Sequence, residues 1–302
     1  MSAGDPSPYR LDNLRSAVGH YLLGRGASAI AVLVSAVLLV RHMTVPDYAA
    51  YTAIMGIAGI VGMLSSLGIE RVVTRFVPEG RLSQRARSLA TLVWCTLAVR
   101  LVATGLFATG LAMVWPRVIR WFEFVTLGQF PLSLGIFLLA TTTLGLASTV
   151  LQALVRQRLL TRISVLQWGG RLAWIILLTS QGASISLEQA LWIMALPELA
   201  GVAAILLGLG HALGWSAPPD RGDATPWPDW HEVWYLARHS YGYNVLASLP
   251  QGYLMRTLVG ATLPVETVAA YGFFSNLAGR LRMYLPMQLM YNLIEPVLRS
   301  TP

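Results

Sequence analysis

Lysine is absent from this sequence, and charge of either sign is scarce. All 22 basic residues among the 302 are arginine, only 14 residues are acidic, and 12% of the chain is charged. A soluble domain carries about twice that charged fraction, so the composition excludes a soluble globular protein. A net charge of +8 is compatible with nucleic-acid binding, but the arginines lie in short segments between apolar stretches. There they are typical of topogenic charge, and we expect no nucleic-acid partner.

Cysteine and known catalytic motifs are equally scarce. The single Cys95 lies in an apolar segment, which excludes a disulfide framework. The five histidines show no metal-site spacing, and no phosphate-binding glycine loop, nucleophile elbow or paired-carboxylate motif occurs. We therefore expect no metal, no cofactor and no enzymatic activity. A membrane polymerase or ligase of lipid-linked sugars is an alternative, but the longest expected outer loop, about 116–126, is short and has one acid, Glu123.

Apolar stretches long enough to cross a bilayer dominate the chain. No acidic or basic side chain lies between Asp47 and Glu70 or between Glu123 and Arg156, and a hydrocarbon core about 30 Å thick needs roughly 20 apolar residues per helix. We predict an all-α polytopic membrane protein of about eight transmembrane helices. The expected spans are about 19–41, 48–69, 89–115, 127–154, 162–181, 189–210, 237–260 and 268–294.

Arginine is distributed unevenly between the two ends of these spans. The segments after the second and fourth spans, both expected to be loops, are rich in arginine: Arg71, Arg75, Arg81, Arg85, Arg87, Arg156, Arg158 and Arg162. The opposite loops hold only Arg41, Arg117 and Arg120. Because basic loops stay on the cytoplasmic side of a membrane, the N-terminus is predicted to be cytoplasmic.

A linker and a repeat suggest how the chain is organised. Residues 211–236 combine prolines with acids and, towards their end, contain Trp227, Trp230 and Trp234 at three- and four-residue spacing. This spacing predicts a helix on the cytoplasmic membrane surface. Val45–Tyr51 and Val265–Tyr271 both read V-x-x-x-A-A-Y and both join two expected spans on the outer face, which indicates a duplication. The expected parts are a cytoplasmic tail (1–18), a first six-helix lobe (19–210), the linker (211–236) and an incomplete second lobe (237–302).

Several segments resemble motifs of a known transporter family. Gly68–Glu79 resembles a G-x-x-x-x-x-x-R-F-x-x-E segment, with Arg75, Phe76 and Glu79 at the matching positions. Pro46–Tyr51 resembles an acidic-Tyr-Gly-x-Tyr turn with alanine in place of the glycine, and 268–280 resembles the start of an eighth helix. These motifs are those of the oligosaccharide (O-antigen and polysaccharide) flippase family of the multidrug/oligosaccharidyl-lipid/polysaccharide exporter superfamily, and the similarity covers nearly the whole chain.

The resemblance implies a function, a location and a larger architecture. It implies a flippase that moves a polyprenyl-diphosphate-linked oligosaccharide across the bacterial cytoplasmic (inner) membrane for cell-surface polysaccharide biosynthesis, by rocking of two lobes. Family members have about 12 to 14 helices, whereas this sequence holds about eight. We therefore expect a piece of a longer product, a protein that needs a partner subunit or self-association, or a truncated, non-transporting membrane scaffold.

Charged side chains inside spans are costly and therefore informative. Five arginines lie well within expected helices: Arg100, Arg171, Arg256, Arg280 and Arg282. Arg25 lies near the inner end of the first span, and Glu198 is the acid clearly within a span. This excess of arginine over acidic residues inside the spans favours an anionic ligand, because guanidinium groups match phosphate oxygens. We predict Arg25 and Arg256 as the main diphosphate ligands, assisted by Arg280 and Arg100.

Other roles stay open for some of these residues. Arg171 and Glu198 each lie about ten residues from an outer turn, so they reach similar depths and are predicted to form a structural ion pair. Arg25 and Arg256 could instead snorkel to the lipid headgroups. The alternative function is a cation-coupled multidrug antiporter of the same superfamily. It would require Glu198, and the first span lacks the carboxylate that would bind a cation.

Overall fold

The computed structural model describes residues 11–83, 85–122, 129–213, 227–248 and 252–283, with side chains from Gly26 in the first helix to Gly279 in the last. Within these ranges the protein is all-α. The helices are α1 (Leu11–His42), α2 (Val45–Leu64), α3 (Ile69–Leu82), α4 (Ala86–Phe122), α5 (Leu132–Ala153), α6 (Gln157–Ser180), α7 (Leu187–Leu213), α8 (Trp230–Ser248), α9 (Gly252–Thr262) and α10 (Val265–Met283).

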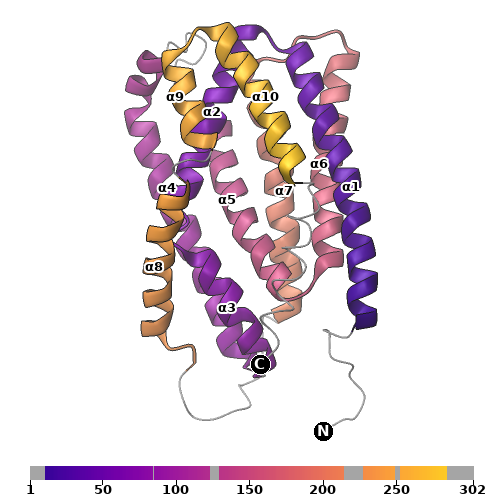
Figure 1. The fold of residues 1–302 in the computed structure, drawn as a ribbon, viewed down its shortest axis with the longest axis vertical. Coiled ribbons are helices and arrows are strands. Elements are labelled where there is room, and N and C mark those ends of the chain that lie inside the picture. The colour runs from indigo at the N-terminus through magenta and orange to yellow at the C-terminus, as the bar shows by residue number, and fades with distance from the viewer. Residues whose placement is uncertain (1–10, 84, 123–128, 214–226, 249–251, 284–302) are drawn as a thin grey trace.

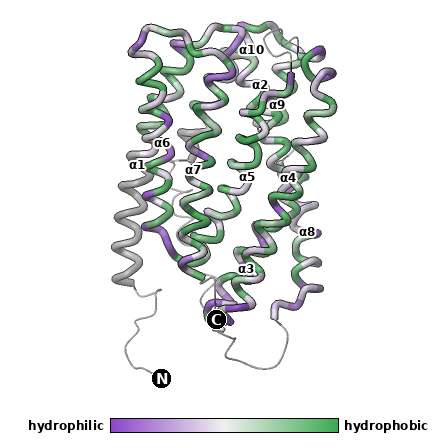
Figure 2. The backbone as a smooth tube through the Cα atoms, turned by 180° about the vertical axis from the view of Figure 1, so that it is seen from behind, coloured by the Kyte–Doolittle hydropathy of each residue, from purple (hydrophilic) through white to green (hydrophobic). Residues whose placement is uncertain are grey.

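Several of these helices can cross a membrane. By length and composition, α2, α4, α5, α6 and α7 qualify among the described residues, and α1 adds a shorter apolar stretch, Ser28–His42. Hydrophobic residues follow the middle of the helices, and hydrophilic ones gather towards the two ends of the bundle (Figure 2). The fold class is therefore that of a polytopic membrane protein, as the sequence predicts.

The bundle has two ends (Figure 1). At the hairpin end, short turns join α1 to α2 (Met43–Thr44), α6 to α7 (Gln181–Ser186) and α9 to α10 (Leu263–Pro264). At the opposite end, here called the α3 end, lie α3 and the turn between α5 and α6. Helix α5 packs against α3, α4 and α7, and α1 packs along α6.

The arginine-rich segment after α2, expected to be a loop, is helix α3. Its buried residues recur at three- and four-residue spacing and form one apolar face: Ile69, Val72, Val73, Phe76, Val77 and Gly80. Leu67 and Gly68, with φ of 48° and 72°, separate α2 from α3, because the left-handed region cannot continue a helix. The expected span 48–69 is therefore wrong at its end, since α2 stops at Leu64.

The expected seventh span, 237–260, is divided between α8 and α9, and residues 249–251 between them lie outside the described residues. Helix α8 begins at Trp230, inside the predicted surface helix. Trp230 and Trp234 are 51% and 69% exposed, whereas Trp227 precedes the helix and packs against α3. The prediction that all three tryptophans share one helix face is therefore wrong for Trp227. Expected span 268–294 corresponds to α10 as far as Met283, and the rest lies outside the described residues.

Helices α9 and α10 pack directly on α2. Gly59 lies against Tyr253 of α9, and Gly272 of α10 lies against Thr52. The two copies of V-x-x-x-A-A-Y occupy the same position, because Val45 and Val265 are the first residues of α2 and α10. Both helices leave a turn at the hairpin end (Figure 1). The division into lobes stays a prediction.

Candidate functional site

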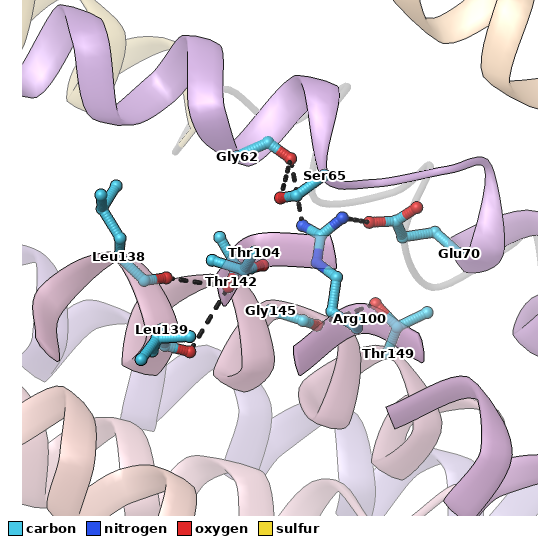
Figure 3. A network of polar contacts seen from close by, with 10 residues as sticks. All are labelled: Gly62, Ser65, Glu70, Arg100, Thr104, Leu138, Leu139, Thr142, Gly145 and Thr149. Carbon is cyan, nitrogen blue, oxygen red and sulfur yellow. Dashed lines mark hydrogen bonds and ion pairs between the residues drawn. The ribbon is translucent and has the colours of Figure 1, made fainter. Parts of the chain in front are cut away.

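Arg100 joins three helices in the interior of the bundle (Figure 3). It lies on α4, and its Nη2 donates a hydrogen bond of 3.2 Å to the Gly62 carbonyl in the last turn of α2. Its Nη1 lies 3.4 Å from Oε1 of Glu70, in the first turn of α3. A cation suits the carbonyl end of a helix, and an acid suits the amide end. The Arg100 side chain is 6% exposed, so a phosphate would have to displace Glu70 to reach it.

The structure brings Arg171 of α6 and Glu198 of α7 together. Nη2 of Arg171 donates a hydrogen bond to Oε1 of Glu198 in the interior. The same nitrogen lies 3.4 Å from the Met194 carbonyl, and Gln167 Nε2 donates to the Pro197 carbonyl at 3.4 Å. Pro197 has no backbone N–H to donate within α7. Close to it, Arg171 and Gln167 of α6 donate to backbone carbonyls of α7. Both charges are thereby occupied within the protein.

The guanidinium of Arg171 also stacks on the indole of Trp168, one turn earlier on α6. Its Cζ lies 4.3 Å from the ring centroid, a close cation–π contact. Arg171 therefore fixes the orientation of Trp168 as well as neutralising Glu198.

Arg256 differs from Arg100 and Arg171 because no carboxylate of the described residues forms an ion pair with it. It lies half-buried on α9, and its Nε donates a hydrogen bond of 3.2 Å to Ser275 Oγ of α10. Among the described residues, the positive charge of Arg256 is therefore not neutralised by a carboxylate.

The side chains of Arg25 and Arg280 lie outside the described residues, so their convergence on Arg256 stays a prediction. Their positions along α1 and α10 are nevertheless defined. At a rise of 1.5 Å per residue, Arg25 lies about 25 Å and Arg280 about 22 Å from the hairpin end of its helix, whereas Arg256 lies about 9 Å from it. Arg25 and Arg280 thus share one level, and Arg256 lies closer to the hairpin end.

The motif residues Arg75, Phe76 and Glu79 all bind the segment that opens α8. Arg75 pairs with Glu232, and Glu79 accepts a hydrogen bond of 2.9 Å from Trp227 Nε1. Phe76 meets the Trp227 ring edge to face, with 6.3 Å between centroids. We call these five residues the α3–α8 clamp. The sequence places the motif in a loop and so gives no sign of this contact, although the spacing of the tryptophans draws attention to Trp227.

A pocket lies near the hairpin end between α1, α2, α6, α7 and α10. Its lining includes four aromatic residues, Tyr48, Tyr51, Trp168 and Phe273, and two small polar ones, Ser35 and Asn276. We call it the aromatic pocket. Among the described residues that line it, none is charged. Sequence reasoning missed it because its residues come from five separate helices.

Among the described residues, no group of three or more histidine, cysteine, aspartate or glutamate side chains could hold a metal ion. No protein-family model and no curated protein matches the sequence. A solved structure described as "protein A" has a similar fold, with a TM-score of 0.63 and 13% identity. The alignment covers 97% of this chain and 66% of that one, so the chain spans about two thirds of the length of its structural neighbour. At that identity the likeness shows the fold alone.

Proposed function

We propose that this membrane protein translocates a polyprenyl-diphosphate-linked oligosaccharide across the bacterial cytoplasmic membrane, with the α3 end on the cytoplasmic side. The observation that carries the proposal is Arg256, a half-buried guanidinium on α9 that forms no ion pair with a carboxylate of the described residues. A cation within a membrane-spanning bundle is costly unless an anion compensates it. A diphosphate supplies that anion, and its oxygens match the guanidinium fork.

The positions of the other arginines support a path for the diphosphate rather than a single cage. Arg25 and Arg280 share a level about 13 to 16 Å farther from the hairpin end than Arg256. The anion would meet Arg25 and Arg280 first and Arg256 later, as the head group moves towards the hairpin end. Arg100 has no place in this ligand set, because it is held by Glu70 and the Gly62 carbonyl.

The two alternatives lack comparable support. An antiporter needs a carboxylate that can bind a cation, but Glu198 is paired with Arg171. A non-transporting scaffold gives no reason for an uncompensated guanidinium on α9, and it predicts that replacing Arg256 is harmless.

The test is a flipping assay with purified protein in liposomes and a fluorescent polyprenyl-diphosphate-linked sugar. We expect Arg256→Ala to slow translocation about tenfold or more, since a hydrogen bond to a charged group contributes about 1.5 to 3 kcal/mol. Arg256→Lys keeps the charge but loses the fork and should fall in between. The matched control is Arg238→Ala, at an exposed arginine of α8. Wild-type flipping by Arg256→Ala would refute the proposal.

A further inference from the structure

We infer that the α3–α8 clamp is a releasable latch, closed in this structure, that opens to let the lipid-linked head group enter the bundle from the cytoplasmic side. The inference rests on the proposed function, which places the α3 end in the cytoplasm. Among the described helices, α8 packs mainly against α3, with a smaller contact to α2, and it runs towards the α3 end of the bundle (Figure 1). Separation of α8 from α3 would therefore open this end.

Helix α8 contributes little apolar surface to its contact with α3. Its buried residues are Val233 and Ala237, which form a small cluster with Val72 and Phe76 of α3 and Leu92 of α4. The other residues of α8 are exposed or half-exposed. Inside a membrane, apolar side chains gain little by leaving lipid for protein, so two small buried side chains hold a helix weakly. The polar contacts of the clamp therefore supply much of the attachment.

Water reaches these polar contacts. The side chains of Arg75 and Glu232 are 50% and 43% exposed, and Glu79, which accepts the hydrogen bond from Trp227, is exposed as well. An exposed ion pair is weak, and salt screens it. Because both charges are hydrated again when the pair separates, the clamp is able to open without leaving a buried charge behind.

The Arg171–Glu198 pair shows a permanent link in the same chain. Its side chains are 4% and 12% exposed, and separating them would leave two buried charges without counter-charges. Both pairs join one helix to another, but the first lies in the interior and the second, in the clamp, lies at the surface. This difference in exposure marks the clamp as the link that opens.

A tight contact nearer the hairpin end supplies a pivot. Helices α9 and α10 follow α8 along the chain, and both pack on α2. A Cβ on Gly59 of α2 would lie 2.1 Å from Tyr253 of α9, and a Cβ on Gly260 of α9 would lie 2.7 Å from Ala53 of α2. Small residues at such points allow two helices to approach closely and to pack well. Because this contact is close and the clamp is weak, a rotation about the pivot separates α8 from α3.

The first test measures opening of the latch without a transport assay. Spin labels are placed at Ser83, which follows α3, and at Trp234 of α8, both exposed, in a Cys95→Ser background in nanodiscs. We expect pulsed electron resonance to show two populations of label-to-label distance. Glu232→Gln/Trp227→Phe removes both polar contacts and keeps an aromatic ring, and it should raise the longer-distance population about threefold.

A matched label pair within the first lobe is the control. It joins Ser83 to Arg162 of α6, also exposed. Arg81, near the end of α3, donates a hydrogen bond to the Leu154 carbonyl after α5, so these segments are held together independently of α8. We expect one distance population that the double variant does not change. A single, unchanged population for the α3–α8 label pair as well would overturn the latch.

The second test measures whether transport needs the opening. A short bifunctional thiol reagent, cleavable by reduction, joins Arg75→Cys to Glu232→Cys across the clamp in the Cys95→Ser background. We expect cross-linking to slow flipping of the fluorescent lipid-linked sugar about tenfold or more, and reduction to restore the rate. As a control, the same reagent joins Arg71→Cys to Arg75→Cys within α3, and this cross-link should leave the rate of that variant unchanged.

The outcomes separate the latch from the function beneath it. Equal flipping before and after cross-linking across the clamp would overturn the inference and leave the flippase proposal standing. Flipping by a protein with a single distance population would do the same. A wild-type protein that shows two distance populations but flips nothing would overturn the proposed function and the part of the latch in it, whereas the opening itself would stand.

Discussion

Three guanidinium groups at membrane depth have three different surroundings. Arg100 completes the end of α2 and pairs with Glu70, Arg171 pairs with Glu198 and supports Trp168, and Arg256 has a serine partner alone. Because a buried charge without a counter-charge destabilises the fold, the ion pairs of Arg100 and Arg171 are parts of the architecture, whereas Arg256 is the arginine that we propose as a ligand site. Residue type and depth do not separate these roles, but the partners do.

The Arg171–Glu198 pair yields a prediction about stability. Arg171→Met or Glu198→Leu alone leaves one buried charge uncompensated and should reduce the free energy of unfolding by about 3 kcal/mol. The double variant Arg171→Met/Glu198→Leu removes both charges and should recover most of that loss. Denaturant unfolding in detergent measures both effects. Glu188→Gln, at an exposed acid of the same helix, is the control, and additive losses in the double variant would contradict the prediction.

At the scale of elements, α3 and α8 are joined by side chains rather than by chain continuity. Gly80 allows the contact, since a Cβ there would lie 2.3 Å from the Trp227 ring. The Trp227 ring packs edge to face against Phe76, and its Nε1 donates a hydrogen bond to Glu79. The R-F-x-x-E motif therefore acts as a docking site for the segment that begins α8.

Removing Trp227 should loosen that docking. In Trp227→Ala we expect amide hydrogen exchange in the first two turns of α8 to accelerate about tenfold. The variant lacks the aromatic contact with Phe76 and the hydrogen bond to Glu79, so local opening of α8 costs less free energy. Trp230→Ala, at the half-exposed tryptophan that begins α8, should exchange at the wild-type rate. Equal acceleration in the two variants would show that the clamp does not hold α8.

These elements also show where sequence reasoning succeeds. The long apolar runs predict α4 to α7, and counting residues from a shared turn places Arg171 beside Glu198, because helix rise is constant. The same counting fails at α3, where dense arginine conceals an apolar face, and at α8–α9, where a single apolar run holds two helices. The aromatic pocket depends on which faces of five helices meet, and one-dimensional periodicity does not determine that.

At the scale of the whole molecule, the hairpin end and the α3 end make orientation testable. In a Cys95→Ser background, Gln181→Cys at the hairpin end should react with a membrane-impermeant maleimide in intact cells, because basic segments stay cytoplasmic. Ser83→Cys at the α3 end should react only after permeabilisation. Both positions are exposed, so access depends on the side of the membrane. The reverse labelling pattern would overturn the orientation.

The meeting of α2 and α10 has a consequence for the two copies of the repeat. Thr52 follows the last tyrosine of the first V-x-x-x-A-A-Y copy, Gly272 follows that of the second, and a Cβ on Gly272 would lie 2.0 Å from Thr52 Oγ1. Thr52 and Gly272, which are equivalent positions of the two copies, thus meet across two parallel helices, as equivalent residues do in an isologous dimer. The close approach of α2 and α10 at this point therefore depends on an unequal pair of residues, a side chain on one helix and glycine on the other.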